Sequence, residues 1–162
     1  MTLNPLAVQF QKHLTKIASG VAVVTAEDQP RRLLCDVFDH NPLAVSFERL
    51  ELATSELASA TAADLERMSK LLAERLTYLM EPIAPIEIDA QECVVQLRSN
   101  PPQRDDDGRS YYELIVRRGG EISLARYHKQ NGTARQPIPA TVTREVLLRL
   151  VGDFCAVLDQ GK

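Results

Sequence analysis

Four side chains of the kinds that bind metal ions lie close together in the sequence: Cys35, Asp36, Asp39 and His40. The surrounding residues, RRLLCDVFD, predict a β-strand followed by a turn. Because successive side chains of a strand point to opposite faces, Cys35 and Asp39 would share one face, and Asp36 and His40 the other. This arrangement does not gather four ligands at one point, so the sequence predicts a buried cysteine beside a polar turn, and no metal site.

The segment from Arg98 to Arg135 is the most basic part of the chain, with eight basic against five acidic residues and tyrosines between them. Such a surface is typical of contacts with an anion, a nucleic acid or a protein partner. The candidate contact residues are Arg98, Arg117, Arg118, Arg126 and Lys129. The alternative is an exposed sheet face on which charges pair across strands, as Glu113 would with Arg126, and the sequence favours this interpretation.

Catalysis has little support in the sequence. The chain contains no nucleophile elbow, no phosphate-binding loop, no zinc-protease motif and no dinucleotide-binding glycine pattern. His13, His40 and His128 lie far apart in the sequence. We therefore expect a protein without catalytic residues.

The clearest single element is TSELASATAADLERMSKLLAERLTYLM, which contains no glycine or proline. Its pattern predicts a helix over residues 55–80, capped by Thr54 or Ser55. One face carries apolar side chains at spacings of three and four, and it is the candidate dimer or partner face: Leu65, Met68, Leu72, Leu76 and Leu79. The alternative for this face is simple cover for a sheet.

The other elements surround this helix. A first helix is predicted from Asn4-Pro5, and a last helix from Thr141 or Thr143. Three strands are predicted before the long helix and four after it, and a Gly119-Gly120 turn would set Ile115 opposite Leu124. The order α-βββ-α-ββββ-α predicts an α+β fold with antiparallel sheet and helices packed on it. We expect one domain over 1–162, with a possible division into 1–53 and 54–162, and the sequence leaves open whether the strands form one sheet or two.

Composition narrows the functional classes. The chain has 162 residues, a net charge of −3 and 5% aromatic residues, so broad nucleic-acid binding is possible but not favoured. No apolar run approaches the roughly 20 residues that span a bilayer. Cys35, Cys93 and Cys155 are odd in number and widely separated, which predicts reduced thiols in a cytoplasmic protein.

One segment resembles a known family. Phe10 followed by IASGVAVVTA, together with NPLAVSF at 41–47, is similar to the N-terminal strands of the flavin-reductase-like, FMN-binding split-barrel proteins. The resemblance covers about a quarter of the chain, and it implies a barrel that binds FMN. The residues between the two strands, CDVFDH, depart from the family's phosphate-binding Ser and Thr, because carboxylates repel a phosphate. The residues therefore favour a core strand at 20–26, and we expect no cofactor.

In its order of elements and acidic isoelectric point, the chain also resembles the small dimeric secretion chaperones. That likeness concerns layout and involves no shared motif. We expect a non-catalytic protein-binding or chaperone-like module of a bacterial cytoplasm, with a protein partner or self-association as a homodimer. The alternatives are an FMN-type small-ligand protein and an anion or nucleic-acid contact through residues 98–135.

Overall fold

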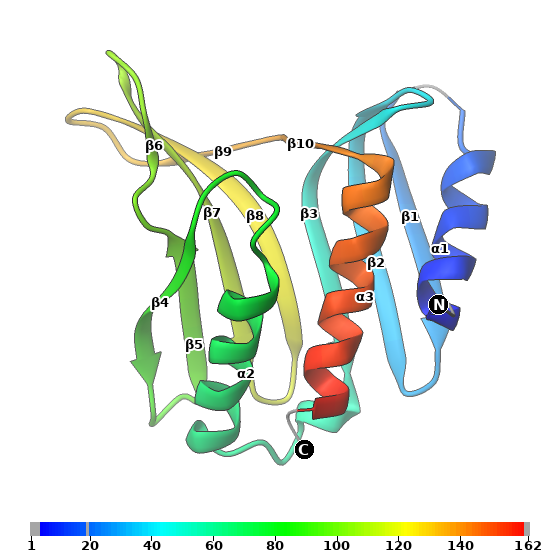
Figure 1. The fold of residues 1–162 in the computed structure, drawn as a ribbon, viewed down its shortest axis with the longest axis horizontal. Helices are drawn as coiled ribbons and strands as arrows, with labels where there is room; N and C mark the ends of the chain where they lie inside the picture. The colour runs from blue at the N-terminus through cyan, green and yellow to red at the C-terminus, as the bar shows by residue number, and fades with distance from the viewer. Residues whose placement is uncertain (1–3, 19, 161–162) are drawn as a thin grey trace.

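The fold was analysed in a computed structural model, which describes residues 4–18 and 20–160. Three helices pack against one antiparallel sheet, which confirms the predicted α+β class (Figure 1). The elements in chain order are α1 (Pro5–Lys16), β1 (Ala22–Asp28), β2 (Arg31–His40), β3 (Ala44–Thr54), the 3₁₀ turn η1 (Ser55–Leu57), α2 (Ala62–Arg75), β4 (Ile83–Asp89), β5 (Val94–Ser99), β6 (Gln103–Arg104), β7 (Gly108–Arg117), β8 (Glu121–Gln130), β9 (Gln136–Ile138), β10 (Ala140–Thr143) and α3 (Arg144–Gln160).

The two groups of strands form one sheet, which settles a point that the sequence leaves open. Its main order is β1-β2-β3-β8-β7-β5-β4, and β3 and β8 join the two halves with Leu50 opposite Leu124. Three short strands lie in segments predicted as loops or as the start of the last helix: β6 pairs with β7, β9 with β8, and β10 with β3. The sheet is open, with β1 and β4 at its edges. The described residues therefore do not form the barrel that the FMN-family resemblance implies.

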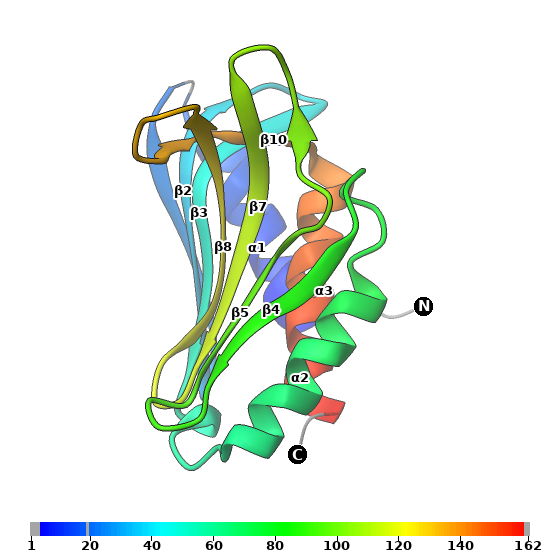
Figure 2. The ribbon, with the colours of Figure 1, turned by 90° about the vertical axis from the view of Figure 1, so that its left-hand side faces the viewer.

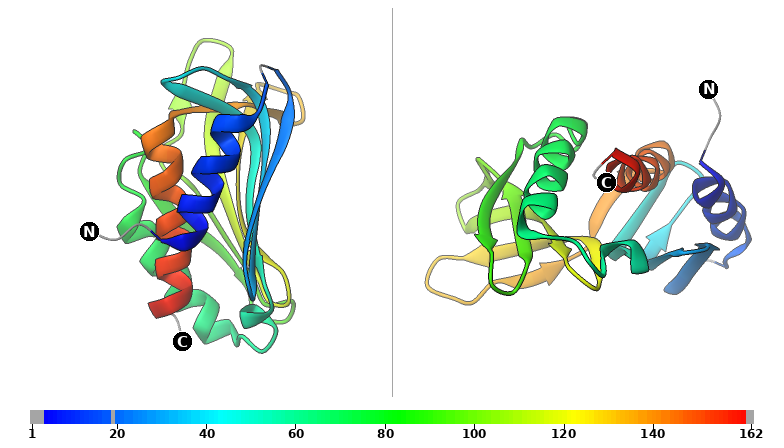
Figure 3. Two further views of the ribbon diagram at one scale, coloured as in Figure 1. Left: turned by 90° about the vertical axis from the view of Figure 1, so that its right-hand side faces the viewer. Right: turned by 90° about the horizontal axis from the view of Figure 1, so that it is seen from below.

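All three helices cover the same face of the sheet. Figure 2 shows the strands on one side and the helices on the other, and the view from below in Figure 3 shows the same two layers. We call the covered face the inner face and the opposite one the outer face. Leu50, Leu52, Leu114 and Leu124 point to the inner face and are fully buried there. The core thus lies between the sheet and the helices.

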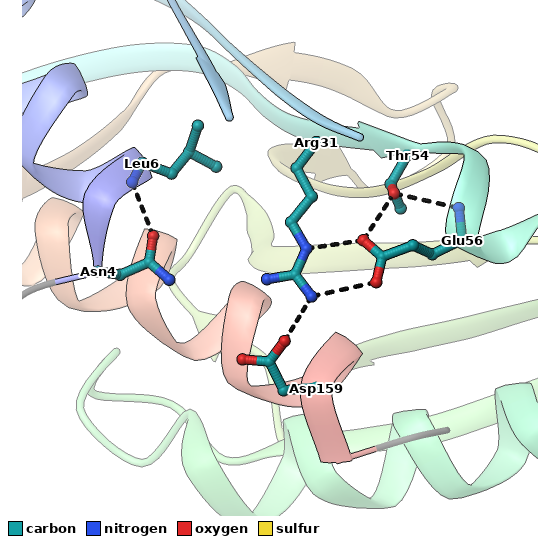
Figure 4. Close-up of polar contacts among 6 residues, drawn as sticks. All are labelled: Asn4, Leu6, Arg31, Thr54, Glu56 and Asp159. Atoms are coloured by element: carbon teal, nitrogen blue, oxygen red, sulfur yellow. Dashed lines mark hydrogen bonds and ion pairs between the residues drawn. The ribbon is translucent and has the colours of Figure 1, made fainter. Parts of the chain in front are cut away.

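The first helix begins where the sequence predicts. The Asn4 side chain accepts a hydrogen bond from the Leu6 backbone N–H at 2.8 Å, and Pro5 occupies the first turn (Figure 4). This is the usual capping arrangement, because the first backbone N–H groups of a helix have no partner within it. The last helix follows Thr143, whose hydroxyl accepts a hydrogen bond from the Val146 N–H. Of the two predicted starting points, Thr143 is therefore the cap.

The region predicted as one helix over 55–80 is divided in the structure into the 3₁₀ turn η1 and the shorter helix α2. Thr61 and Asp64 form a reciprocal capping box that begins α2, with each side chain accepting a hydrogen bond from the other's backbone N–H. After Arg75 the chain leaves the helix but stays apolar, so Leu76 and Leu79 still lie in the core. The predicted helix is thus interrupted before Thr61 and ends after Arg75, although the segment contains no glycine or proline. The capping box decides where α2 begins.

The hairpin between β7 and β8 differs from the prediction by one residue. Leu114, not Ile115, lies opposite Leu124, and the loop comprises residues 118–120, with Gly119 at a φ of 74°. A shift of one residue moves every side chain to the other face. The observed register places both leucines in the core, whereas the predicted one would have faced Leu124 with an outer-face residue. Burial therefore set the register.

An ion-pair network ties the bottom of the sheet, as drawn in Figure 1, to the end of α3. The Arg31 guanidinium donates to both carboxylate oxygens of Glu56, at 2.8 and 3.2 Å, and also to Asp159 (Figure 4). Thr54 donates its hydroxyl to Glu56 at 2.9 Å. The network joins β2, η1 and α3, which lie far apart in the sequence. It holds this end of the molecule together.

Candidate functional site

The five candidate basic residues do not form one site, because the structure places them in three regions. Arg126 belongs to the side of the sheet that faces the helices. Its guanidinium forms an ion pair with Glu81 at 2.9 Å and lies 4.5 Å from the centre of the Tyr112 ring. The prediction that Arg126 pairs with Glu113 is wrong, because the register of the hairpin puts these two residues on opposite faces.

Arg117 and Arg118 lie at the hairpin end of the outer face. They border a hollow of about 480 Å³ together with Glu87, Asp89 and Glu92. Arg117 also forms an ion pair with Glu121 at 3.5 Å. The Gly119-Gly120 turn that the sequence predicts would have set Arg118 opposite Glu121, and in the structure Arg117 forms the pair instead. Positive and negative charges are mixed here, so this end has no excess of cations.

Arg98 and Lys129 lie at the other end of the outer face, where they border a hollow of about 390 Å³. Two further cations, Arg109 and Arg135, line the same hollow. The candidate set omitted these two because sequence spacing alone does not show which strand positions meet across a sheet. In the structure Arg109 lies directly opposite Lys129, which brings both side chains to this hollow.

The candidate dimer or partner face of the long helix is buried within the chain itself. Leu65, Met68, Leu72, Leu76 and Leu79 are all at most 4% exposed, because they pack against the sheet and α3. The expectation that this stripe meets a partner is therefore corrected. An uncovered sheet face would expose its leucines to water, so the sheet takes the helix stripe as its cover.

The metal-type residues near Cys35 also separate, but not in the predicted pairs. The β2–β3 ladder shifts register between Asp36 and Asp39, so that Asp39 lies opposite Ser46 and His40 opposite the buried Val45, and His40 instead of Asp39 shares the face of Cys35. Cys35 is fully buried on the inner face, and Asp36 lies opposite Arg49 of β3. Burial raises the pKa of the Cys35 thiol well above its usual value, which keeps it protonated. Within residues 4–18 and 20–160, no group of three or more His, Cys, Asp or Glu side chains could hold a metal ion.

The largest exposed apolar side chains at one end of the sheet belong to β1 and its neighbours. Val21 is 82% exposed and Val23 is 60% exposed, and Phe38 of β2 and Leu43 of the following turn are also exposed. Val23 lies opposite Asp36, and the ladder ends with Ala22 opposite Val37, the residues next to Val21 and Phe38. We call Val21, Val23 and Phe38 the apolar edge. Neighbouring exposed apolar side chains on an edge strand favour pairing with another chain.

The backbone of β1 is capped over only part of its free side. The Gln9 side chain of α1 accepts a hydrogen bond from the Glu27 N–H at 2.6 Å and donates one to the Glu27 carbonyl at 3.1 Å. His13 donates a ring N–H to the Thr25 carbonyl. Gln9 thus occupies the place that a residue of a neighbouring strand would take. Glu27 must therefore direct its backbone groups away from β2.

Alternation along the strand extends this result to the other residues of β1. Residues that are two positions apart direct their backbone groups the same way in an antiparallel ladder. Val23 and Thr25 therefore direct their N–H groups away from β2, as Glu27 does. Neither N–H donates to any partner in the part of the chain that the structure describes. We call residues 22–25 the upper half of β1. This half thus presents two unpaired N–H donors beside the apolar edge.

The opposite edge strand, β4, has features that discourage pairing. Pro85 lacks an N–H, the ladder with β5 shifts its register between Pro85 and Glu87, and acidic side chains follow at Glu87 and Asp89. Prolines, bulges and charges are the usual means by which proteins block an edge. β1 has charged residues only at its lower end, at Glu27 and Asp28. The two edges are therefore not equivalent.

The strands around the apolar edge are held in place from behind. His40 at the end of β2 donates a ring N–H to the Ala18 carbonyl at 2.8 Å, which fixes the segment entering β1. Arg144 of α3 donates to the Asn41 carbonyl at 2.8 Å, and its own backbone N–H donates to the Leu43 carbonyl. The edge is thus presented on a fixed framework. Ser19, which belongs to the segment that resembles the FMN family, lies outside the described residues.

No protein family, curated protein or solved structure matches the chain. Among the described residues, no helix has both the length and the apolar composition to cross a membrane.

Proposed function

We propose that the chain is a non-catalytic, chaperone-like protein-binding module that takes an extended segment of a partner protein along β1. The observation that carries the proposal is the upper half of β1, where the unpaired N–H groups of Val23 and Thr25 lie beside the exposed Val21 and Val23 side chains. An extended peptide supplies both the carbonyl groups that these donors need and side chains that cover the valines. This is the mode known as strand addition.

The α1 helix defines how far such a segment would extend. Gln9 already saturates both backbone groups of Glu27, and His13 takes the Thr25 carbonyl. An added strand would therefore pair with Val21 and Val23, reach only the N–H of Thr25, and stop at Gln9. Five residues of strand span about 17 Å, which suits a short linear motif. Apolar residues at alternate positions of that motif would cover Val21 and Val23.

A peptide selection tests this proposal directly. A phage-displayed library of random peptides is selected on the wild-type protein and then screened against Val23→Pro. Proline at this position removes an N–H that β2 does not use, so it blocks an added strand but leaves the β1–β2 ladder intact. Val23→Thr is the matched control, because it keeps the N–H and the β-branched shape. We expect selected peptides to bind the wild type and the threonine variant but not the proline variant.

Circular dichroism melting verifies that each variant folds. If Val23→Pro does not fold, Val23→Lys replaces it, because a lysine on an edge strand keeps the fold but discourages pairing. The proposal fails if every selected peptide binds the folded edge variants as tightly as it binds the wild type.

A second copy of the chain is another source of an extended strand. Two β1 strands paired antiparallel would join two sheets across a twofold axis and produce a homodimer. Native mass spectrometry separates this outcome from binding of a foreign segment. A dimer that Val23→Pro converts to a monomer identifies the second copy as the occupant. A wild-type monomer that binds selected peptides identifies a foreign segment.

A further inference from the structure

Three cations lie directly opposite one another at the loop end of the outer face. Arg104 of β6 pairs with Arg109 of β7, and Arg109 pairs with Lys129 of β8. We call these three residues the cation row. Directly opposed residues have Cβ atoms about 5 Å apart, and like charges on such residues are destabilising. None of the three forms an ion pair with any residue that the structure describes, so the repulsion is not relieved within the chain.

The cation row borders two hollows. Arg109 and Lys129 line the hollow of about 390 Å³ that also contains Arg98 and Arg135. All three members of the row also line a second, smaller hollow of about 190 Å³. Asp105 lies in this smaller hollow, but its carboxylate accepts hydrogen bonds from the Asp107 and Gly108 N–H groups within its own turn. It forms no ion pair with the row.

The carboxylate that contacts residues lining the larger hollow, Glu113, is already engaged. Glu113 is 6% exposed. Its carboxylate accepts hydrogen bonds from both terminal guanidinium nitrogens of Arg135 and from the Gln96 side chain, the latter at 2.8 Å. Arg98 reaches it only at 3.5 Å, and the Arg98 Nε has no hydrogen-bond partner among the described residues. Four cations therefore line the hollow, and only Arg98 and Arg135 contact Glu113, which Arg135 nearly saturates. The balance leaves an excess of three positive charges at this hollow.

The tyrosines at the hollow define the class of anion. The Arg98 guanidinium lies 4.5 Å from the centre of the Tyr111 ring, and that of Arg135 lies 3.9 Å from the centre of the Tyr127 ring. Tyr111 is only 2% exposed. Each ring has an arginine over one face, and the buried Tyr111 offers no face on which a nucleobase could stack. The site thus favours a small anion whose own charge is multiple.

We propose that the outer-face hollow at the cation row binds a small multivalent phosphate, such as a diphosphate group, with Arg98, Arg109 and Lys129 as its contacts. Arginine suits phosphate because its planar group donates two parallel hydrogen bonds to oxygens. A ligand with two or more negative charges would offset the repulsion within the row. The site is separate from the β1 edge and does not rest on the proposed function.

Isothermal titration calorimetry with inorganic pyrophosphate at constant ionic strength tests this proposal. The test variant is Arg109→Gln/Lys129→Gln, in which both residues are partly exposed and lack ion pairs. The matched control is Arg117→Gln/Arg118→Gln, which removes the same charge from the other end of the same face. We expect the test variant to weaken binding at least tenfold, since it loses two charge-assisted contacts. The control and Val23→Pro keep the wild-type affinity.

Two results of the pyrophosphate titrations would overturn the proposal. One is equal weakening by both double variants, which would mean that net charge alone attracts the anion. The other is an absence of pyrophosphate binding to the folded wild-type protein. A twenty-nucleotide single-stranded DNA serves as a further probe: binding that is tighter than that of pyrophosphate and falls steeply with salt would replace the phosphate site by a nucleic-acid contact. Melting temperatures give an independent readout, because pyrophosphate should raise that of the wild type but not that of the test variant.

Discussion

Glu113 is the most heavily bonded side chain of the outer face. It is buried on a face that no helix covers, because Arg98, Arg135, Tyr111 and Gln96 surround it. Its hydrogen bonds to Arg135 raise the pKa of that guanidinium above its already high ordinary value. Arg135 in turn anchors the loop between β8 and β9 to β7. One carboxylate thus fixes both the loop and the wall of the hollow.

We predict that Glu113→Gln lowers the free energy of unfolding by about 3 kcal/mol, because it leaves a partly buried arginine without its carboxylate. Urea denaturation followed by circular dichroism measures the change. Glu66→Gln is the control, since its pair with Lys70 is exposed and worth at most about 0.5 kcal/mol. Equal effects of the two substitutions would show that Glu113 does not organise this face.

Gly108 is required by the close approach of β7 to β8. A Cβ at this position would lie 2.1 Å from the Lys129 carbonyl oxygen and 2.9 Å from the Gln130 Cα. Backbone atoms cannot move aside as a side chain does. We predict that Gly108→Ala lowers the free energy of unfolding by about 1–3 kcal/mol, as overpacking usually does.

The readout for Gly108→Ala is again urea denaturation, with Gly152→Ala as the control. A Cβ at Gly152 meets no atom within 4 Å, and alanine is the better helix former there. An alanine at 108 that leaves stability unchanged would mean that the two strands separate at no cost.

For individual residues, the sequence identified which side chains are charged but not which residues they contact. It located an excess of cations between Arg98 and Arg135, and the structure does contain a cluster of them. It could not say that Arg126 lies on the other side of the sheet or that Arg109 faces Lys129, because both depend on a register that differs by one residue from the predicted one. A tight turn with two glycines permits more than one loop length, and burial of Leu114 and Leu124 chose between them.

The elements themselves were more predictable where a local signal exists. Asn4-Pro5 and Thr143 mark helix starts in the sequence and in the structure. The signal for the start of α2, Thr61 followed by Asp64, was also present in the sequence, although the periodic apolar pattern around it predicted a longer helix. Periodicity describes which residues are buried, and Leu76 and Leu79 are buried outside the helix. It therefore predicts burial better than it predicts helix ends.

The capping box of α2 makes its stability depend on pH. The hydrogen bonds from the Thr61 backbone N–H and side chain lower the pKa of Asp64 below its ordinary value, with Arg67 adding a smaller effect. A carboxyl group whose pKa is lower in the folded state stabilises the fold above its unfolded pKa, about 4, and loses that effect as the pH falls through the folded value.

We therefore predict that Asp64→Asn is less stable than the wild type at pH 7, and that the difference shrinks below about pH 4 and vanishes once the native Asp64 is protonated. Urea denaturation of both proteins at a series of pH values between 7 and 2 measures it. A stability difference that stays constant across this range would contradict an ionised Asp64 cap.

The whole molecule depends on a pairing that no local signal predicts. β3 and β8 are separated in sequence by α2 and four strands, yet they join the two halves into one sheet. Sequence patterns describe faces and turns, whereas the neighbour of a strand is decided by packing across the entire domain. The same limit applies to the edges: which strand remains unpaired is visible only once the full order is known. The free β1 edge therefore could not have been located from the sequence.

The Arg31 network contributes to the stability of the whole molecule. Arg31 joins β2 to η1 and to the end of α3, and its side chain is only 13% exposed. We predict that Arg31→Met lowers the free energy of unfolding by about 2–4 kcal/mol, because Glu56 loses its bidentate partner in a largely buried position. The neighbouring Arg32→Met is the control: its ion pair with Glu27 is long and exposed, so the change should stay within about 0.5 kcal/mol.

Both arginine variants are compared by urea denaturation with fluorescence of the tyrosines and with circular dichroism. Coincident transitions would show that the two halves unfold together. An Arg31→Met protein as stable as Arg32→Met would mean that the network does not hold the end of α3 to the sheet.

The proposed function requires the upper half of β1 to be an unpaired edge that accepts an extended strand. Residue-resolved amide hydrogen exchange by NMR, with and without a selected peptide, tests it most directly. We expect the Val23 and Thr25 N–H groups to exchange fast in the free protein, while Val24 and Ala26, which pair with β2, are protected. Bound peptide should slow Val23 and Thr25 specifically. Slow exchange of these two amides in the free monomer, or new protection elsewhere with none at β1, would contradict the claim.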